Sequence, residues 1–380
     1  MDFDLSWILL GFPIAFVLGW LASRFDFRQL RVENRLAPKA YFKGLNYLLN
    51  EQQDQAIDAF IEAVQKDPDT SELHFALGNL FRRRGEYERA VRVHEHLLSR
   101  GDLSAADRDR AQHALALDFL KAGLLDRAET ALRKLEGTDF EASSRLALLA
   151  IYERSRDWAD ASEIAHKLET AGQGSFSGRQ SHYLCEQAAA QPEAAQGLLE
   201  KAIAIAPQAA RPRIDLAILQ HQAGQLDEAF KTLQALSESA PAAIPLVAER
   251  IATIAAAAGL TDPALALLES SYAQSASLDV LQAILGLQVR SGTPMTEVRM
   301  RYLKHLEREQ SLVAVARWIA GEKLEHEEFH PQIQRALDHA ASPMKRYRCA
   351  ACGFEAKQHF WQCPGCQAWD SYPARRVEEL

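Results

Sequence analysis

The sequence predicts an all-α protein in which one helix pair is repeated along the chain, preceded by an apolar helix and followed by a small cysteine-containing domain. Three observations support this prediction. Apolar residues recur at a 34-residue spacing between Tyr41 and Leu98, an uncharged apolar stretch runs from Leu5 to Ala22, and four of the five cysteines cluster after residue 348. The composition agrees, because 48% of the 380 residues are hydrophobic and only 14 are proline.

The N-terminal apolar stretch predicts a single membrane-spanning helix at residues 1–23. It holds 18 residues without a charge, which approaches the shortest helix that crosses a bilayer. Trp7 and Trp20 lie near its two ends, where interfacial aromatic residues are typical. Asp2 and Asp4 precede it, in place of the basic residue that a cleaved signal peptide requires. The sequence therefore favours an anchor that the protein retains.

Residues 24–39 are predicted to form a basic juxtamembrane linker that sets the orientation of the chain. No basic residue precedes Arg24, whereas Arg28, Arg31 and Arg35 follow it closely. Basic residues stay on the cytoplasmic side of a membrane, so the bulk of this single-pass chain is predicted to be cytoplasmic. The arginines lie three or four residues apart, and the sequence leaves open whether they also contact anionic lipid head groups.

The repeats occupy residues 40–342 and are clearest in their first two copies. The first copy consists of Gly44, Tyr47, Ala56, Phe60, Ala63 and Pro68, and the second of Gly78, Phe81, Ala90, His94 and Leu97. A 34-residue period is typical of the tetratricopeptide repeat, a pair of antiparallel helices. The small residues are expected where two helices cross, and Pro68 where the second helix stops. One pair cannot bury its apolar face alone, so the copies must stack into a superhelix.

The array continues with four further clear copies before its signature fades toward residue 340. The third contains Ala116, Phe119 and Ala128, the fourth Leu149, Tyr152 and Ala161, the fifth Ala195, Leu199 and Ala202, and the sixth Ala217, Ala229 and Leu233. Weaker spacing after them brings the expected number of helix pairs to about nine.

The concave face of such an array usually holds a peptide or protein segment. Polar candidates for contact on that face are Asn46, Asn79, Arg82, Arg83 and Asp118. The array contains more acidic than basic residues, and the whole chain has a net charge of −8. This balance argues against nucleic acid as the main ligand.

No enzymatic site is predicted. His326-Glu-Glu-Phe-His330 matches the H-E-x-x-H pattern of zinc proteases. However, Pro331 follows directly, the stretch is highly charged, and no clear third ligand follows, so we interpret it as a solvated helix end. Cys185 stands alone in a predicted helix and is interpreted as a small buried apolar residue. The sequence assigns no catalytic residue and predicts a non-enzyme.

Residues 343–380 are predicted to form a small metal-binding domain. Cys349-Ala-Ala-Cys352 is followed after ten residues by Cys363-Pro-Gly-Cys366. Two C-x-x-C turns at such spacing indicate four thiolate ligands around one ion, either iron or zinc. Two disulfides are disfavoured in the predicted cytoplasmic location. Four protein ligands would leave no open position for catalysis.

The two cysteine turns resemble the knuckle pair of rubredoxins, which favours iron. Gly353 and Gly365 would let the backbone curl so that amides reach the sulfurs. Gln367 replaces the glycine that is usual after the last rubredoxin cysteine, and the loop between the turns is shorter. These departures favour a structural or docking role over electron transfer. The surplus of aromatic residues around Cys363 suggests that the domain packs back on the array.

The order of these parts resembles the lipopolysaccharide assembly protein B family of Gram-negative bacteria. The resemblance covers the whole chain and is carried by the stretches Gly78–Arg82, Arg348-Cys349, Cys352–Phe354 and Trp361–Pro364. It implies an inner-membrane adaptor that regulates lipopolysaccharide synthesis. Such an adaptor presents the lipid A pathway deacetylase to the membrane-bound AAA protease FtsH and coordinates lipopolysaccharide assembly proteins. The resemblance also implies that the four clustered cysteines are the metal ligands and that catalytic residues are absent.

Three other hypotheses stay open at this point. The chain is alternatively a general membrane scaffold for another complex, or a redox protein that uses the four-cysteine iron site. The basic C-terminal tail also suggests a zinc ribbon that binds nucleic acid, although no nucleic-acid partner is expected. The oligomeric state is open, a homodimer included.

Overall fold

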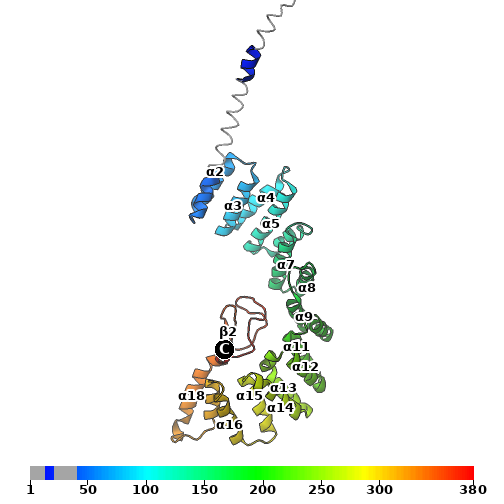
Figure 1. The fold of residues 1–380 in the computed structure, drawn as a ribbon, viewed down its shortest axis with the longest axis vertical. Helices are drawn as coiled ribbons and strands as arrows, with labels where there is room; N and C mark the ends of the chain where they lie inside the picture. The colour runs from blue at the N-terminus through cyan, green and yellow to red at the C-terminus, as the bar shows by residue number, and fades with distance from the viewer. Residues whose placement is uncertain (1–12, 21–40) are drawn as a thin grey trace, which may run out of the picture. The chain divides into compact units, whose positions relative to one another are not determined.

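The computed structural model describes residues 13–20 and 41–380, and the chain divides into two compact units, Met1–Ser155 and Arg156–Leu380. Figure 1 shows neighbouring helices stacked side by side within each unit. The predicted domain limits after residues 23, 39 and 342 stay predictions, as does the superhelical course of the whole array.

The first unit consists of helical hairpins. Residues 41–49 are helical and are followed by α2 (Gln53–Lys66), α3 (Ser71–Arg84), α4 (Tyr87–Ser99), α5 (Ala105–Ala122), α6 (Leu125–Arg133) and α7 (Glu141–Ser155). Each helix packs on the next along the chain from α2 to α7. Gly85 and Gly123 end α3 and α5 in the left-handed conformation, with φ of 86° and 78°, which glycine adopts without strain.

The second unit continues the same pattern and ends in a small domain without α-helix. Its α-helices are α8 (Trp158–Thr170), α9 (Ser177–Ala190), α10 (Ala195–Ile205), α11 (Ala210–Gln222), α12 (Leu226–Ser239), α13 (Ile244–Ala258), α14 (Thr261–Gln274), α15 (Leu278–Arg290), α16 (Met295–Leu306), α17 (Leu312–Ile319) and α18 (His330–Ala341). The strands β1 (Tyr347–Arg348) and β2 (Glu355–Ala356) then form one antiparallel pair. From residue 41 onward, the described residues contain seven α-helices in the first unit, residues 41–49 included, and eleven in the second.

The burial of the repeat positions confirms the helical repeat. Ala56, Ala90 and Ala128 are completely buried, as expected for small residues at helix crossings. The largest core cluster lies in the second unit and is formed by apolar residues of α11 to α15, among them Leu233 and Ile251. Cys185 is also buried, with 2% of its surface exposed, which confirms its interpretation as a core residue.

Gly78 shows why one repeat position must be small. His94 stands where this repeat usually has phenylalanine, and its imidazole lies against the backbone of α3. A Cβ atom on Gly78 would lie 2.5 Å from both Cε1 and Nε2 of His94, which is far inside van der Waals contact. The His94 side chain is fully buried and has no free space in which to move aside.

We therefore expect Gly78→Ala to destabilise the first unit by about 1–3 kcal/mol, the usual effect of overpacking a core. This loss is measured by chemical denaturation in which hydrogen exchange of α3 and α4 is monitored. Gly286→Ala is the control, because Gly286 lies inside α15 with nothing within 4 Å of its added Cβ. That variant should be neutral or stabilising by about 0.5–1 kcal/mol. Equal effects of the two substitutions would contradict the close-approach explanation.

The predicted membrane helix lies mostly outside the described residues. Residues 13–20 are helical, and their apolar side chains are exposed, with Phe16 74% and Leu18 62% accessible. Among the described residues, one helical stretch, Pro241–Ala258, has the length and composition of a membrane span. Half of that stretch is buried inside the second unit, as expected of a core helix.

Candidate metal centre

The four clustered cysteines meet at the end of the chain. β1 leads into the turn that carries Cys349 and Cys352, and β2 follows that turn. Cys363 and Cys366 lie on a second turn facing the first. All four Sγ atoms lie within 4.8 Å of one another. We use the name knuckle domain for residues 343–380, which contain this four-cysteine metal-binding site.

The sulfur positions fit one tetrahedral ion. Sγ atoms of Cys349 and Cys366 lie 3.8 Å apart, and those of Cys352 and Cys363 lie 3.7 Å apart. A tetrahedron with metal–sulfur bonds of about 2.3 Å has edges of about 3.8 Å. The four cysteines are free thiols in the structure, and each of the two close pairs joins one turn to the other. The donor set therefore suits zinc or iron, both of which accept four thiolates.

The two turns have matching backbone geometry. The amide of Gly353 donates to the carbonyl of Cys349 at 2.9 Å, and the amide of Gln367 donates to the carbonyl of Cys363 at 2.8 Å. Gly353 and Gln367 both have positive φ, of 78° and 62°. The left-handed residue is thus the one after each second cysteine. Gly365 instead has no positive φ, and its added Cβ would lie 3.4 Å from Phe354.

The surroundings of Cys349 favour its ionised form, and the backbone amides of Ala351 and Cys352 contribute to this. Cys349 Sγ lies 3.3 Å from Ser371 Oγ. The hydrogen bond with Ser371, with the backbone amides adding to it, lowers the pKa of Cys349 to about 6. These contacts favour the thiolate, the form of cysteine that binds a metal.

Replacing Gln367 by glycine should stabilise the knuckle domain. A residue with a side chain in the left-handed conformation costs about 1 kcal/mol, which glycine avoids. We expect Gln367→Gly to slow metal release to a chelator several-fold, measured by the absorbance of a metal–chelator complex. Gln358→Gly is the control, because Gln358 is exposed and lacks positive φ. It should leave the release rate unchanged or raise it, and a slower rate there would contradict the explanation.

The knuckle domain packs on the helices of the second unit through Trp369. The indole stacks on the imidazole of His182, with ring centroids 4.7 Å apart, and meets Trp158 and Tyr183 edge-on. His182 Nε2 lies 2.9 Å from the carboxylate of Asp370. These helical residues come from α8 and α9, about 190 to 210 positions earlier in the sequence. The predicted packing of the domain on the array is therefore confirmed.

The last residues of the chain attach the domain to α15 and α17. Arg376 Nε donates to Asp279 Oδ2 at 2.7 Å. Glu379 accepts a hydrogen bond of 2.6 Å from the amide of Leu278, and Glu378 accepts one of 3.3 Å from the amide of Val313. Both carboxylates thus satisfy free amides at helix N-termini. The sequence interpretation missed these contacts, because a Glu-Glu pair near a chain end has no local signature.

The H-E-x-x-H stretch does not form one helix. A short 3₁₀ helix covers Glu327–Phe329, and α18 begins at His330. The Nε2 atom of His330 lies 3.0 Å from the carbonyl oxygen of Ile319. The prediction of no protease site stands on this geometry, since the two histidines do not share a helical face. The expected helix end at Pro331 is wrong, because proline occupies the first turn of α18, where its missing amide costs nothing.

The polar candidates for the concave face divide into two groups. Asn46 and Arg83 are exposed, and their predicted role stays a prediction. Asp118 is completely buried, so its assignment to an exposed face is wrong. Its carboxylate accepts hydrogen bonds from Arg82 Nη1 at 2.9 Å and from His94 Nδ1 at 2.5 Å.

The hydrogen bonds around Asp118 continue through Arg82 to Asn79. Arg82 Nη2 donates to Asn79 Oδ1 at 2.5 Å, and Arg82 Nη1 also donates to the Ala114 carbonyl. Asn79, Arg82 and Asp118 therefore join α3 to α5. Asn79 and Arg82 are partly exposed, so their role on the concave face stays a prediction. The spacing of the repeats did not predict this network, because it depends on His94, which replaces the usual phenylalanine and contacts the buried Asp118.

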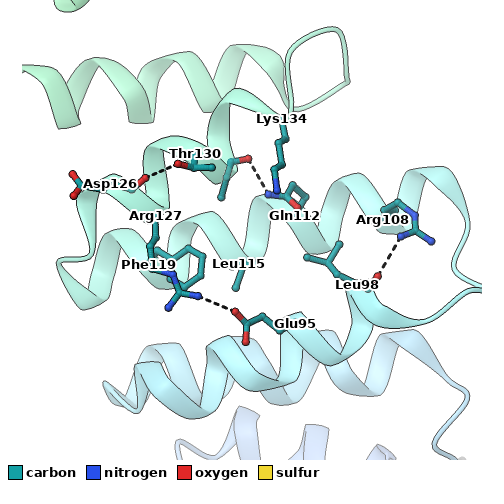
Figure 2. Close-up of a pocket in the computed structure, with 11 residues that line it drawn as sticks. Glu95, Leu98, Arg108, Gln112, Leu115, Phe119, Asp126, Arg127, Thr130 and Lys134 are labelled. Atoms are coloured by element: carbon teal, nitrogen blue, oxygen red, sulfur yellow. Dashed lines mark hydrogen bonds and ion pairs between the residues drawn. The ribbon is translucent and has the colours of Figure 1, made fainter.

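A pocket that the sequence did not predict lies among α4, α5 and α6. Figure 2 shows Arg127 crossing from α6 toward Glu95 on α4, with Phe119 beneath it. The pocket has a volume of about 600 Å³, and Leu98 and Leu115 are among the apolar residues that line it. The guanidinium of Arg127 lies 4.2 Å from the centroid of the Phe119 ring. Its lining comes from three helices, so no short stretch of sequence indicates it.

Comparison with known proteins agrees with this architecture. Residues 347–372 match the model of a rubredoxin metal binding domain, and residues 187–254 match that of a tetratricopeptide repeat. Among solved structures, Naa15/Naa10 bound to HypK-THB is 14% identical, with a TM-score of 0.44, and covers 81% of this chain and 47% of its own. That likeness is too distant to add to the fold described above.

Two curated relatives extend along the whole chain. Lipopolysaccharide assembly protein B of Escherichia coli K12 is 29% identical over 391 residues, covering 99% of this chain and 100% of its own. The Haemophilus influenzae protein of the same name is 27% identical and covers 97% of each chain. Their name is that of an assembly protein, which is consistent with the prediction of a non-enzyme. The chain is thus similar along its whole length to proteins named lipopolysaccharide assembly protein B, as its sequence motifs predicted.

Proposed function

We propose that this chain is an inner-membrane adaptor that regulates lipopolysaccharide synthesis. In this proposal it presents the lipid A pathway deacetylase to the FtsH protease and gathers lipopolysaccharide assembly proteins at the membrane. The observation that carries the proposal is the similarity to lipopolysaccharide assembly protein B across the apolar N-terminus, the helical repeats and the knuckle domain. Stacked helical repeats bind protein segments in many families, which supports a scaffold.

The membrane part of the proposal rests on the N-terminal residues. The described turns at residues 13–20 expose their apolar side chains, with Trp20 52% accessible. An isolated apolar helix of this kind is stabilised by burial in lipid. A single anchor would hold the array beside membrane-bound partners and raise their effective concentration without additional contacts. The cytoplasmic side follows from the arginines after residue 23.

The metal part of the proposal assigns the ligands and the role of the ion. Cys349, Cys352, Cys363 and Cys366 would hold one iron or zinc ion. When bound, the ion closes the two turns into one rigid body. Four sulfurs fill a tetrahedral site, so no position is left for a substrate. Packing of Trp369 against α8 and α9 then makes the ion a structural element of the second unit.

The adaptor proposal is tested by crosslinking in native membranes followed by affinity purification of the full chain. We expect FtsH and the lipid A pathway deacetylase to be enriched with it, and the deacetylase to persist longer in cells that lack this chain. Metal analysis of the same sample by mass spectrometry distinguishes iron from zinc.

A matched variant makes the test specific to the docked domain. Trp369→Ala removes the indole that packs against His182, Trp158 and Tyr183, and we expect it to reduce deacetylase turnover. Trp318→Ala, a substitution of the same type on α17, should change turnover less. If neither protein is enriched and deacetylase lifetime is the same with and without the chain, the adaptor proposal is wrong.

A further inference from the structure

A pocket of about 300 Å³, lined by several charged residues, lies in the second unit where the knuckle domain meets α15 and α17. Five basic residues line it, and they come from separate segments of the chain. Arg317 lies on α17, Lys345 and Arg346 follow α18, Lys357 follows β2, and Arg376 lies in the C-terminal tail. Two acidic residues, Asp279 and Glu378, also reach the lining.

The two acidic residues neutralise only part of this positive charge. Asp279 is paired with Arg376, whose Nε and Nη2 donate to it at 2.7 and 3.3 Å. Glu378 accepts hydrogen bonds from Ser311 Oγ and from the amide of Val313. Glu378 thereby stabilises the start of α17.

Three of the five cations have no such compensation. Arg346 Nη1 lies 3.6 Å from Glu355 Oε2, so it is partly compensated. In the part of the chain that the structure describes, Arg317, Lys345 and Lys357 have no carboxylate within ion-pair distance. Three uncompensated cations thus converge on one cavity in a protein whose net charge is −8. Like charges that share a concave site repel one another and attract an anion.

We propose that this pocket binds a phosphate group, either as a free phosphorylated compound or as the head group of a phosphorylated lipid. Ammonium and guanidinium groups are donors only, and phosphate oxygens accept several charged hydrogen bonds at once. The volume is at the small end of ligand sites, so it suits a phosphate or diphosphate group better than a folded peptide segment.

The position of the pocket gives the bound anion a structural consequence. Lys345 and Lys357 belong to the knuckle domain, whereas Arg317 belongs to α17. An anion bound between them links the knuckle domain to α17 and reduces the repulsion between the positive charges on the two sides of this interface. Binding should therefore stabilise the packing of the knuckle domain and slow metal release to a chelator. This site does not depend on the adaptor role, so either proposal can fail without the other.

The test is calorimetric titration of the full chain in neutral-lipid nanodiscs with two probes. Pyrophosphate represents the free compound, and dioctanoyl phosphatidic acid represents the lipid head group. We expect at least one of them to bind, with an affinity that falls as ionic strength rises. Binding of pyrophosphate alone assigns the free source, and binding of phosphatidic acid alone assigns the lipid source. No binding of either probe at low ionic strength overturns the proposal, as does tighter binding of a hexaglutamate peptide.

Substitutions locate the site. The double variant Lys345→Gln with Lys357→Gln should weaken binding about tenfold, the usual effect of losing charged hydrogen bonds. Arg317→Gln should also weaken binding. Because Arg317 lies outside the knuckle domain, this variant still tests the pocket if the lysine variants lose their metal. Lys323→Gln is the control, because Lys323 is exposed and lies outside the pocket. Wild-type affinity in the pocket variants, or an equal loss in the control, overturns the assignment.

Discussion

Cys363→Ser is expected to remove the metal from the purified protein and to release the knuckle domain from the helices. Serine oxygen is a poor ligand for the soft ions that four thiolates select. Structural zinc sites contribute about 10–16 kcal/mol of binding free energy, which is also folding free energy for a small domain. The buried residues Tyr347, Cys349, Cys363 and Tyr372 form the domain's own core cluster, which is too small to replace that contribution.

Two measurements separate this loss from general unfolding. Metal content should fall from about one ion per chain, the stoichiometry of a four-thiolate site, to nearly none. The tryptophan fluorescence, to which Trp369 contributes, should shift toward that of exposed indoles, while far-ultraviolet circular dichroism keeps most of its helical signal. The helices keep that signal because their own cores do not include the cysteine turns.

Cys185→Ser is the matched control for this experiment. Cys185 is a buried cysteine outside the site, packed with apolar residues of α9, α10 and α11. Burial raises the pKa of its thiol, so it stays uncharged and does not compete for metal. The control should retain its ion and the tryptophan emission of the unsubstituted protein. Full metal content in Cys363→Ser would show that this cysteine is not a ligand.

The metal-binding domain could be predicted because its determinants are local. Two ligands separated by two residues must share one turn, and the second turn repeats that geometry within fifteen positions. The docking surface was predicted only in outline. Aromatic surplus near Cys363 indicated that the domain packs on something, but the partners of Trp369 are residues 158, 182 and 183. No periodicity connects positions so far apart.

In the repeat array, too, features set by local sequence spacing were predicted, and features set by contacts between distant residues were not. Alanine and leucine at fixed spacing predicted which positions are buried, and Ala116, Leu168 and Ala217 are indeed inaccessible. The prediction failed at Asp118, which was assigned to an exposed face from its polarity. A carboxylate can be buried only when charged or polar partners compensate for its lost hydration. Those partners, Arg82 and His94, lie on two other helices.

Asp118→Ala is expected to destabilise the first unit by about 3–5 kcal/mol, the usual effect of removing one partner from a buried ion pair. The substitution leaves Arg82, which is only 19% exposed, without its anion. It also removes the carboxylate that is hydrogen-bonded to Nδ1 of the fully buried His94 ring, whose Nε2 already lacks a partner among the described residues. Hydrogen exchange of α3, α4 and α5 measures the loss for this unit alone, since the two units need not unfold together. Asp109→Ala, on the same helix but outside the network, should change exchange by less than about 0.5 kcal/mol.

A triple variant identifies the cause of that instability. If the loss arises from uncompensated burial of Arg82 and His94, replacing the whole network by apolar residues should recover most of it. We therefore expect Arg82→Met, His94→Phe and Asp118→Leu together to exchange more slowly than Asp118→Ala alone. Phenylalanine at position 94 also restores the residue that this repeat usually carries there. If the triple variant is less stable than Asp118→Ala, the attraction among the three side chains outweighs the cost of burying them. The buried charges would then stabilise the first unit.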